Sequence, residues 1–242
     1  MKNTETEDDI VAARAVTDRP DDIILYTPIA GTNEKHGRSW VDASSLFDRH
    51  LAAQGFERRA EELRFWSAAL AGTWFTFSGH QPWIFGGEQL REFLGTLPVV
   101  DGVVDVVLIG HSYGGAVIAY ALAGRPMIHV RAVITMGTPL RRDLDPVWAL
   151  AEEAIVLHIH LYGTGLRSWV RFAGQRLRFR RKMPWLLHNY AVKGGHSGVF
   201  RKAKHIPQID HALSIIRGLQ GFVGCRFAPA PENVSVKTGR IL

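Results

Sequence analysis

One serine in the chain has the neighbours that a nucleophile needs. Ser112 is the centre of a G-x-S-x-G pattern at residues 110–114, which follows an apolar run at 103–109 and precedes an apolar helical segment at 116–123. A serine between two glycines at the end of a buried strand is held on a sharp turn that exposes its hydroxyl. Glycines are needed on both sides because a Cβ there would collide with the adjoining strand or helix. The pattern alone is common, but the strand before it and the helix after it predict a nucleophile rather than a bystander serine.

The elements that would position this serine alternate along the chain. Apolar and β-branched runs predict strands at residues 23–27, 74–77, 103–109, 131–136, 155–161 and 190–192. Helical spacing and stop signals predict helices at 40–54, 61–70, 88–97, 116–123 and 208–221, and residues 167–187 are expected to be partly helical. This alternation predicts an α/β fold with a mostly parallel, twisted sheet covered by helices on both faces.

Several motifs, taken in chain order, resemble those of the α/β-hydrolases, and more narrowly those of small bacterial lipases and esterases. Residues 108–115 match the nucleophile elbow, and residues 134–140 match the Gly-Thr-Pro turn that follows the next strand in many lipases. Residues 25–32 resemble the first core strand with its oxyanion loop, 75–79 the strand before the nucleophile strand, and 195–198 the loop that carries the catalytic histidine. The resemblance covers about residues 23–200 and implies the α/β-hydrolase fold, acyl transfer through a serine, and no cofactor.

The general base is expected to be a histidine, because its unperturbed pKa lies near working pH. In this fold the chain order is serine, acid, histidine, which restricts the base to a histidine after Ser112. His196 has the best context, since it follows the last predicted strand and has glycines on both sides, with His205 and His211 in reserve. His158 and His160 share one face of a predicted strand, where a metal pair is conceivable but no third ligand is evident. The full set of candidates is His129, His158, His160, His188, His196, His205 and His211.

The acid is the part of the site where the resemblance breaks down. Many relatives carry an aspartate just after the strand that here is 155–161, but residues 162–166 contain no carboxylate. Some lipases take the acid from the loop after the preceding strand, and here that loop offers Asp143, which we favour, and Asp145 as the alternative. The histidine would otherwise be oriented by a carbonyl or by a hydroxyl such as that of Thr164. Both aspartates also have an ordinary interpretation, as an ion-pair partner of a nearby arginine or as a helix cap.

The oxyanion hole should be built from backbone N–H groups. One donor is expected from Tyr113, the residue after the nucleophile. The resemblance implies that the second comes from the first-strand loop, where Ile29 or Ala30 would supply it. Relatives often have His-Gly at that turn, whereas this chain has Pro28-Ile29, and Pro28 has no N–H to donate.

These features favour a serine esterase or lipase that acts on a small-molecule or lipid ester. A catalytically weakened α/β-hydrolase that serves as a binding or scaffold module stays open, because the usual acid and the His-Gly loop are absent. Acyl transfer to an alcohol acceptor stays open as well, since it uses the same residues. Fold resemblance does not decide among these functions.

Composition predicts a single soluble domain in a reducing compartment. At 242 residues with 46% hydrophobic content, one domain at 23–225 is expected, with an acidic, mobile tail at 1–22 and an extension at 226–242. No signal-like start and no apolar run of membrane-spanning length is visible in the sequence. The single Cys225 excludes an internal disulfide. We therefore expect a cytoplasmic protein.

The net charge of +6 is concentrated in one segment. Seven basic residues lie between Arg167 and Lys182, interleaved with aromatic side chains. The segment 164–187 falls where relatives often place a cap or lid. Its basic side chains would form a cationic rim that favours esters with a negative group. It could also contact an anionic membrane surface or an acidic partner, although a solvated helix is the simpler interpretation. No nucleic-acid-binding motif is present, so no nucleic-acid partner is expected.

Overall fold

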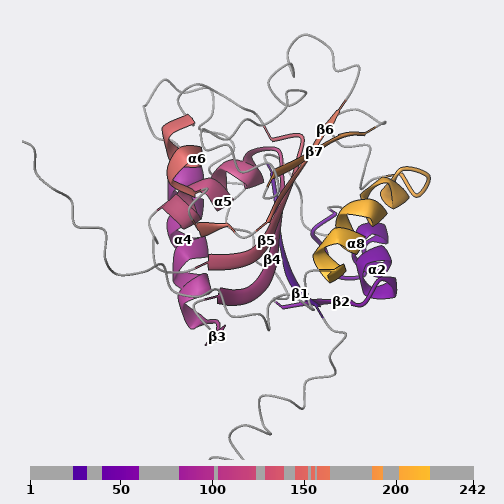
Figure 1. Cartoon of the computed structure of the whole chain (residues 1–242), viewed down its shortest axis with the longest axis horizontal. Coiled ribbons are helices and arrows are strands. Elements are labelled where there is room, and N and C mark those ends of the chain that lie inside the picture. Colours follow the sequence, from indigo (N-terminus) through magenta and orange to yellow (C-terminus); the bar gives the residue numbers. More distant parts are fainter. Residues whose placement is uncertain are drawn as a thin grey trace, which may run out of the picture.

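The fold is described by a computed structural model that covers ten stretches of the chain. They are residues 24–31, 40–59, 82–100, 103–123, 129–138, 145–151, 154–155, 157–163, 187–192 and 202–218. Within these stretches seven strands form one sheet, with the order β2-β1-β4-β5-β6-β7 and the short β3 paired to β4 alone. Figure 1 shows this sheet between two groups of helices.

All strands along the main path of the sheet are parallel, and only β3 runs antiparallel to its neighbour. β4 lies near the middle, with Val107 opposite Tyr26 of β1 on one side and opposite Ala132 of β5 on the other. A strand covered on both faces is expected to be apolar throughout, and residues 106–109 of β4 are fully buried. The strands are β1 (Ile24–Ile29), β2 (Phe56–Arg58), β3 (Val99–Val100), β4 (Val103–His111), β5 (His129–Met136), β6 (His158–Gly163) and β7 (Leu187–Val192).

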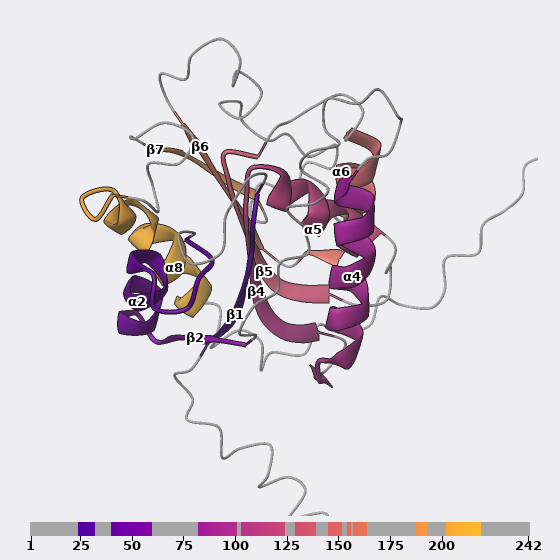
Figure 2. The same ribbon diagram turned by 180° about the vertical axis from the view of Figure 1, so that it is seen from behind.

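The helices form two layers, one on each face of the sheet. Figure 2 shows α4, α5 and α6 on one side and α2 and α8 on the other. In a right-handed crossover, the direction in which the chain moves across the sheet decides which face its helix covers. The connection from β1 to β2 and the connection from β4 to β5 move in opposite directions, so their helices lie on opposite faces. None of the described helices is long and apolar enough to cross a membrane. The helices are α2 (Leu46–Ala53), α4 (Pro82–Thr96), α5 (Tyr113–Ala123), α6 (Asp145–Ala151) and α8 (Asp210–Gly218), with a 3-10 turn, η5 (Ile206–Ile209), before α8.

The strand order reverses between β1 and β4, and this reversal places the candidate site. The chain passes from β1 to β2 on one side, whereas β4 pairs with β1 on the other side. In open α/β sheets, ligands bind at the carboxyl ends of the strands where the order reverses in this way. β1 ends at Ile29 and β4 ends at His111, so Ser112 lies at this switch point.

The predicted mostly parallel sheet with helices on both faces is confirmed, but several element boundaries were wrong. The predicted helix at 40–54 begins only at Leu46, because the Ser45 hydroxyl accepts a hydrogen bond from the Asp48 N–H (3.1 Å) and caps the helix there. The strand predicted at 155–161 begins at His158, and Ile155 forms only an isolated bridge to β5. Leu187, assigned to a partly helical segment, instead begins β7.

Further differences concern short elements and the chain end. β2 and β3 were not predicted, since three and two residues are too few to show a periodic pattern. The helix predicted at 88–97 begins six residues earlier, at Pro82, where proline is tolerated in the first turn. The last helix begins at Asp210 rather than at residue 208. The predicted elements at 61–70 and 74–77 lie outside the described residues.

The contact between α2 and α8 joins distant parts of the chain. His50 Nε2 of α2 lies 2.6 Å from Asp210 Oδ1 of α8. The Arg217 guanidinium of α8 also lies over the Phe56 ring of β2, 5.8 Å from its centroid. Residues of α2, α8, β1 and β6 share one apolar cluster, whereas α4, α5 and α6 share a second cluster on the other face. The fold therefore has one core layer on each side of the sheet.

In the layer formed by α4, α5 and α6, the burial of each leucine predicts how much it contributes to the free energy of unfolding. Leu94 of α4 is fully buried in the second cluster, whereas Leu150 of α6 is 57% exposed. We expect Leu94→Ala to lower the free energy of unfolding by about 2–5 kcal/mol and the control Leu150→Ala to change it by less than about 0.5 kcal/mol. Urea unfolding followed by circular dichroism measures both, and equal losses would contradict the assigned layer.

Candidate active site

Ser112 has a backbone conformation that a serine rarely adopts. Its φ is 53°, in the left-handed region, at the turn between the last residue of β4 and the first residue of α5. An L-residue with a side chain loses about 1–2 kcal/mol in that region. Such strain persists only where the surrounding structure fixes it, and it is found most often at functional sites. The sharp strand-to-helix turn predicted at Ser112 is therefore present in the structure.

Two glycines of the G-x-S-x-G pattern allow backbone segments to touch. A Cβ on Gly110 would lie 2.7 Å from Ile118 Cδ1 and 2.9 Å from the Gly114 carbonyl carbon. A Cβ on Gly114 would lie 2.3 Å from the Ile29 carbonyl oxygen. Atoms do not approach so closely, so any side chain at either position would force the first turn of α5 away from β4 or from β1.

The chain just after β1 lies directly against Ser112. A Cβ on Gly31 would come within 2.9 Å of Ser112 Cβ and within 2.8 Å of the His111 carbonyl oxygen. The backbone of Ile29 and Ala30 contacts Gly114, and Tyr113 is the first residue of α5. The structure thus brings Ile29, Ala30 and Tyr113, the residues expected to form the oxyanion hole, into one neighbourhood around Ser112.

Two hydrogen bonds and one ring contact hold the turn at Ser112. The Ser112 N–H donates to the Met136 carbonyl at the end of β5 (2.9 Å), and the Gly115 N–H donates back to the Ser112 carbonyl (3.1 Å). Trp40 packs edge-on against His111, with ring centroids 6.4 Å apart. Sequence reasoning missed this contact of Trp40, because no local pattern relates a residue before α2 to the end of β4.

The described neighbourhood leaves Ser112 nearly buried. Ser112 is 8% exposed and His111 is 4% exposed. Within the described stretches, no hydrogen bond joins the Ser112 hydroxyl to a histidine ring. Of the expected acid and base residues, His196 and Asp143 lie outside the described residues. Asp145, the alternative acid, is the exposed first residue of α6.

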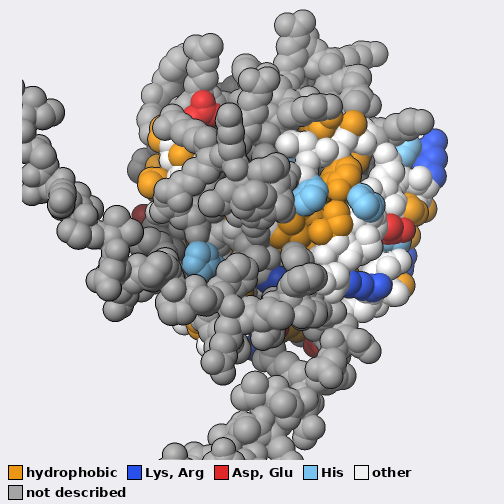
Figure 3. Space-filling view, in the orientation of Figure 1, with side chains coloured by type: hydrophobic (Ala, Val, Ile, Leu, Met, Phe, Trp, Pro, Cys, Tyr) orange, Lys and Arg blue, Asp and Glu red, His pale blue; other side chains and the backbone are white. Residues whose placement is uncertain are grey.

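The other histidines that follow Ser112 have different surroundings. His129 is the first residue of β5, so it lies at the opposite edge of the sheet from Ser112. The side-chain amide of Gln208 lies 3.1 Å from His205 Nδ1. His211 packs edge-on against Tyr190 (5.2 Å between centroids), which stacks on His188 (6.2 Å). Figure 3 shows histidine side chains bordering an apolar area on the face seen there. The basic segment from Arg167 to Lys182 lies outside the described residues.

His158 and His160 form a buried polar group with a threonine. The Thr135 hydroxyl lies 2.9 Å from His158 Nε2 and 2.8 Å from His160 Nδ1, and all three residues are fully buried. Trp148 of α6 stacks on His158. Burial lowers the pKa of His158 well below its usual range, and the neighbouring His160 lowers it further. In the described part of the chain, no three side chains of the metal-binding types gather into a ligand set.

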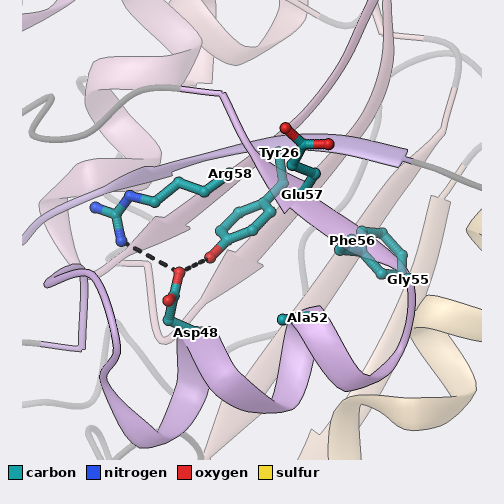
Figure 4. Close-up of a pocket in the computed structure, with 7 residues that line it drawn as sticks. All are labelled: Tyr26, Asp48, Ala52, Gly55, Phe56, Glu57 and Arg58. Carbon is teal, nitrogen blue, oxygen red and sulfur yellow. Dashed lines mark hydrogen bonds and ion pairs between the residues drawn. The ribbon is translucent and has the colours of Figure 1, made fainter.

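A cavity of about 320 Å³ lies between α2 and β2, away from Ser112. In Figure 4 the Tyr26 hydroxyl and the Arg58 guanidinium both reach the Asp48 carboxylate, and Arg58 Nη1 lies 3.3 Å from its Oδ1. Arg58 also donates to the Val41 carbonyl, and the Ser44 N–H donates to the other Asp48 oxygen at 2.8 Å. Burial and the bond to Asp48 raise the pKa of Tyr26. Because these groups bind one another, we interpret them as a structural hydrogen-bond network that joins β1, β2 and α2 rather than as a ligand site.

Comparison with known proteins gives similarity to solved structures only. No protein-family model matches the chain, and no curated protein matches it. One similar structure is the thioesterase domain from the curacin biosynthetic pathway, at 14% identity over 81% of this chain and 91% of that one, with a TM-score of 0.44. Another is a monoacylglycerol lipase from Paleococcus ferrophilus, at 13% identity over 81% and 94%, with a TM-score of 0.42. A third is the esterase domain of a Rhodothermus marinus protein, at 13% identity over 84% and 89%, with a TM-score of 0.43.

The topology of the chain itself defines the fold. The sheet is parallel apart from β3, helices cover both faces, and a strained serine joins β4 to α5 at the switch point. These are the features of the α/β-hydrolase fold, with its serine on a strand-to-helix turn, as the sequence predicts.

The strain at Ser112 gives a prediction about stability. Glycine adopts a positive φ without a steric penalty, so Ser112→Gly should raise the free energy of unfolding by about 1 kcal/mol relative to Ser112→Ala. Both variants lose the hydroxyl, so they differ only in the Cβ. Thermal and urea unfolding would measure the difference, and an alanine variant as stable as the glycine variant would argue against the left-handed turn.

The buried His158 gives a prediction about pH. The unfolded chain takes up a proton on this histidine below about pH 6.5, whereas the native state, with its lowered pKa, does not. The free energy of unfolding should therefore fall as pH drops from about 6.5 towards the native pKa, by up to about 1.4 kcal/mol per pH unit for this group. Urea unfolding between pH 7.5 and 5 should give a shallower slope of the free energy of unfolding against pH for His158→Gln than for the wild type. Equal slopes in wild type and His158→Gln would refute the assignment.

Proposed function

We propose that this chain is a serine hydrolase that cleaves carboxylic esters through an acyl-enzyme on Ser112. The observation that carries the proposal is the left-handed φ of 53° at Ser112, at the carboxyl end of a central parallel strand. A bystander serine in a strand-to-helix turn has no need of this strain, since an ordinary turn or a glycine avoids it. A nucleophile gains from it, because the turn aims the hydroxyl away from both strand and helix.

The proposed reaction has two halves. A base takes the proton from the Ser112 hydroxyl, and Oγ attacks the ester carbonyl carbon, so that its double-bonded oxygen becomes an oxyanion. When the tetrahedral intermediate collapses, the bond to the alcohol oxygen breaks and the base returns the proton to the departing alcohol. Water, deprotonated by the same base, then attacks the acyl-enzyme and frees the acid and Ser112.

His196 is the proposed base, and its distance along the chain from β7 is compatible with this role. β7 is the third strand from β4 in the sheet order, and parallel neighbours are about 4.8 Å apart, which separates the two strand ends by about 14 Å. His196 follows Val192, the last residue of β7, by four residues, and four extended residues reach about 14 Å. The imidazole side chain adds to this reach.

Asp143 is the proposed acid, with Asp145 as the alternative. Both follow β5, which pairs directly with β4, so the loop that carries them starts beside the nucleophile strand. A carboxylate there would hold the imidazole in the required tautomer and stabilise the imidazolium. Asp145 begins α6 and is exposed, which favours Asp143.

The oxyanion would be held by backbone N–H groups at the contact between β1 and α5. The Tyr113 N–H belongs to the first turn of α5, whose positive end of the helix dipole favours negative charge. The second donor is proposed to be the N–H of Ile29 or Ala30, two residues that lie beside the first turn of α5 because their carbonyl groups contact Gly114. Fixed donors at such a position stabilise the transition state by several kcal/mol, about 2.7–4 for a single donor.

The substrate is proposed to be a small-molecule or lipid ester. The basic and aromatic segment from Arg167 to Lys182 would attract esters that carry a negative group, or an anionic membrane surface. Hydrolysis of p-nitrophenyl esters of increasing acyl length, with and without a carboxylate on the acyl chain, would locate the preference.

The test of the function combines a covalent probe with hydrolysis. We expect a fluorophosphonate to label the folded protein at Ser112 and p-nitrophenyl acetate to be hydrolysed. Ser112→Ala and His196→Ala should each lower kcat by a factor on the order of 10⁴ or more, and Asp143→Asn by a factor on the order of 10² to 10⁴. His129→Ala is the matched control, because its ring lies at the opposite edge of the sheet, and its kcat should stay within about twofold. Folded protein that neither binds the probe nor cleaves any ester in the series would refute the proposal.

A further inference from the structure

Thr138 lies where the end of β5 supports the nucleophile turn. The Met136 carbonyl at the end of β5 accepts the Ser112 N–H at 2.9 Å. Gly137 follows with a φ of 57° and donates its N–H to the Leu161 carbonyl of β6 at 2.8 Å. The chain therefore turns sharply after β5 while it stays bonded to β6, and this turn directs Thr138 towards α5.

The side chain of Thr138 fills the space above a glycine of the first turn of α5. A Cβ on Gly115 would lie 2.1 Å from Thr138 Oγ1, 2.6 Å from its Cγ2 and 2.8 Å from its Cβ. All three side-chain atoms of Thr138 thus occupy the place where a side chain at position 115 would go. Gly115 is two residues after Tyr113, so this contact fixes the same helical turn that carries the proposed oxyanion donor.

Hydrogen bonding does not explain why a threonine stands at this position. Thr138 is fully buried, and its Oγ1 has no hydrogen-bond partner among the described residues. A buried hydroxyl without a partner costs about 1–3 kcal/mol, which a valine of the same shape would not incur. The contribution of Thr138 to the described structure is therefore the packing of its branched side chain against Gly115.

We propose that Thr138 is a positioning residue for the elbow: its side chain, seated on Gly115, sets the first turn of α5 and thereby the Tyr113 N–H relative to Ser112. The inference rests on the proposed hydrolase function. Oxyanion donors act only within about 2.7–3.1 Å of the oxygen, and misplacement by about 1 Å can lower a rate about 10²-fold. A turn that can relax into the space left by a smaller side chain would lose part of this alignment without losing the fold.

The test separates alignment from binding and from stability. We expect Thr138→Ala to lower kcat for p-nitrophenyl acetate about tenfold with KM within about twofold, because the contact matters in the transition state. Thr138→Val, which keeps the shape, should restore most of the lost kcat. Thr96→Ala, on the exposed surface of α4, is the control and should leave kcat unchanged. Full activity in Thr138→Ala, or no recovery in Thr138→Val, would overturn the proposal.

A double-mutant cycle tests the contact itself. Gly115→Ala should lower both kcat and the urea midpoint, because its Cβ overlaps the Thr138 side chain. Adding Thr138→Gly removes the overlapping atoms and should recover a large part of both losses, which independent sites would not show. Purely additive effects would overturn the inferred contact.

The two proposals fail in different ways. If the wild-type protein neither binds a fluorophosphonate nor cleaves an ester, the hydrolase function fails, and the positioning role falls with it. If the wild-type protein is active while Thr138→Ala matches it in kcat and in the rate of fluorophosphonate labelling, only the positioning role fails.

Discussion

The rest of the site depends on a close approach of three backbone segments around Ser112. The end of β1, the end of β4 and the first turn of α5 meet so tightly that a Cβ on Gly114 would lie 2.3 Å from the Ile29 carbonyl oxygen. A Cβ on Gly31 would come as close as 2.8 Å to the His111 carbonyl oxygen. Main-chain atoms can surround the serine only because these positions carry no side chain. If main-chain N–H groups form the oxyanion hole as proposed, their positions are fixed, and fixed donors need no rearrangement when charge develops.

The strain of the turn is balanced by the elements on either side of it. β4 pairs with both β1 and β5, and α5 is buried along most of its length between the sheet and helices α4 and α6. Neither element can shift without opening the core, so the turn between them has little freedom to relax to a negative φ. The same burial that stabilises the domain therefore also maintains an unfavourable backbone angle at Ser112.

The parts of the structure that could be predicted from the sequence are those encoded by neighbouring residues. The nucleophile turn follows from glycines next to a serine between two apolar segments, and β1, β4 and β5 were predicted to within a few residues. β2 has three residues and depends on its pairing with β1, so it leaves no pattern of its own.

Contacts between residues that are far apart in the sequence could not be predicted, because no local pattern encodes them. Trp40 meets His111 across 71 positions, and Thr138 meets Gly115 across 23. The sequence places His158 and His160 on one face of a strand, but it does not indicate that the Thr135 hydroxyl of the neighbouring strand lies between them. The base and the proposed acid, His196 and Asp143, lie outside the described residues and stay predictions.

Within the described part of the chain, polar side chains contribute in two ways, by hydrogen bonds between elements and by packing. Tyr26, Asp48 and Arg58 bind one another, and the Thr135 hydroxyl lies between His158 and His160, so these groups link neighbouring elements through hydrogen bonds. Thr138 is fully buried, and its hydroxyl has no hydrogen-bond partner among the described residues, as is also true of Thr27 in β1. What distinguishes Thr138 is its contact with Gly115 in the first turn of α5. It is therefore the packing of this side chain, and not its hydroxyl, that links Thr138 to the turn at which Ser112 has its left-handed φ.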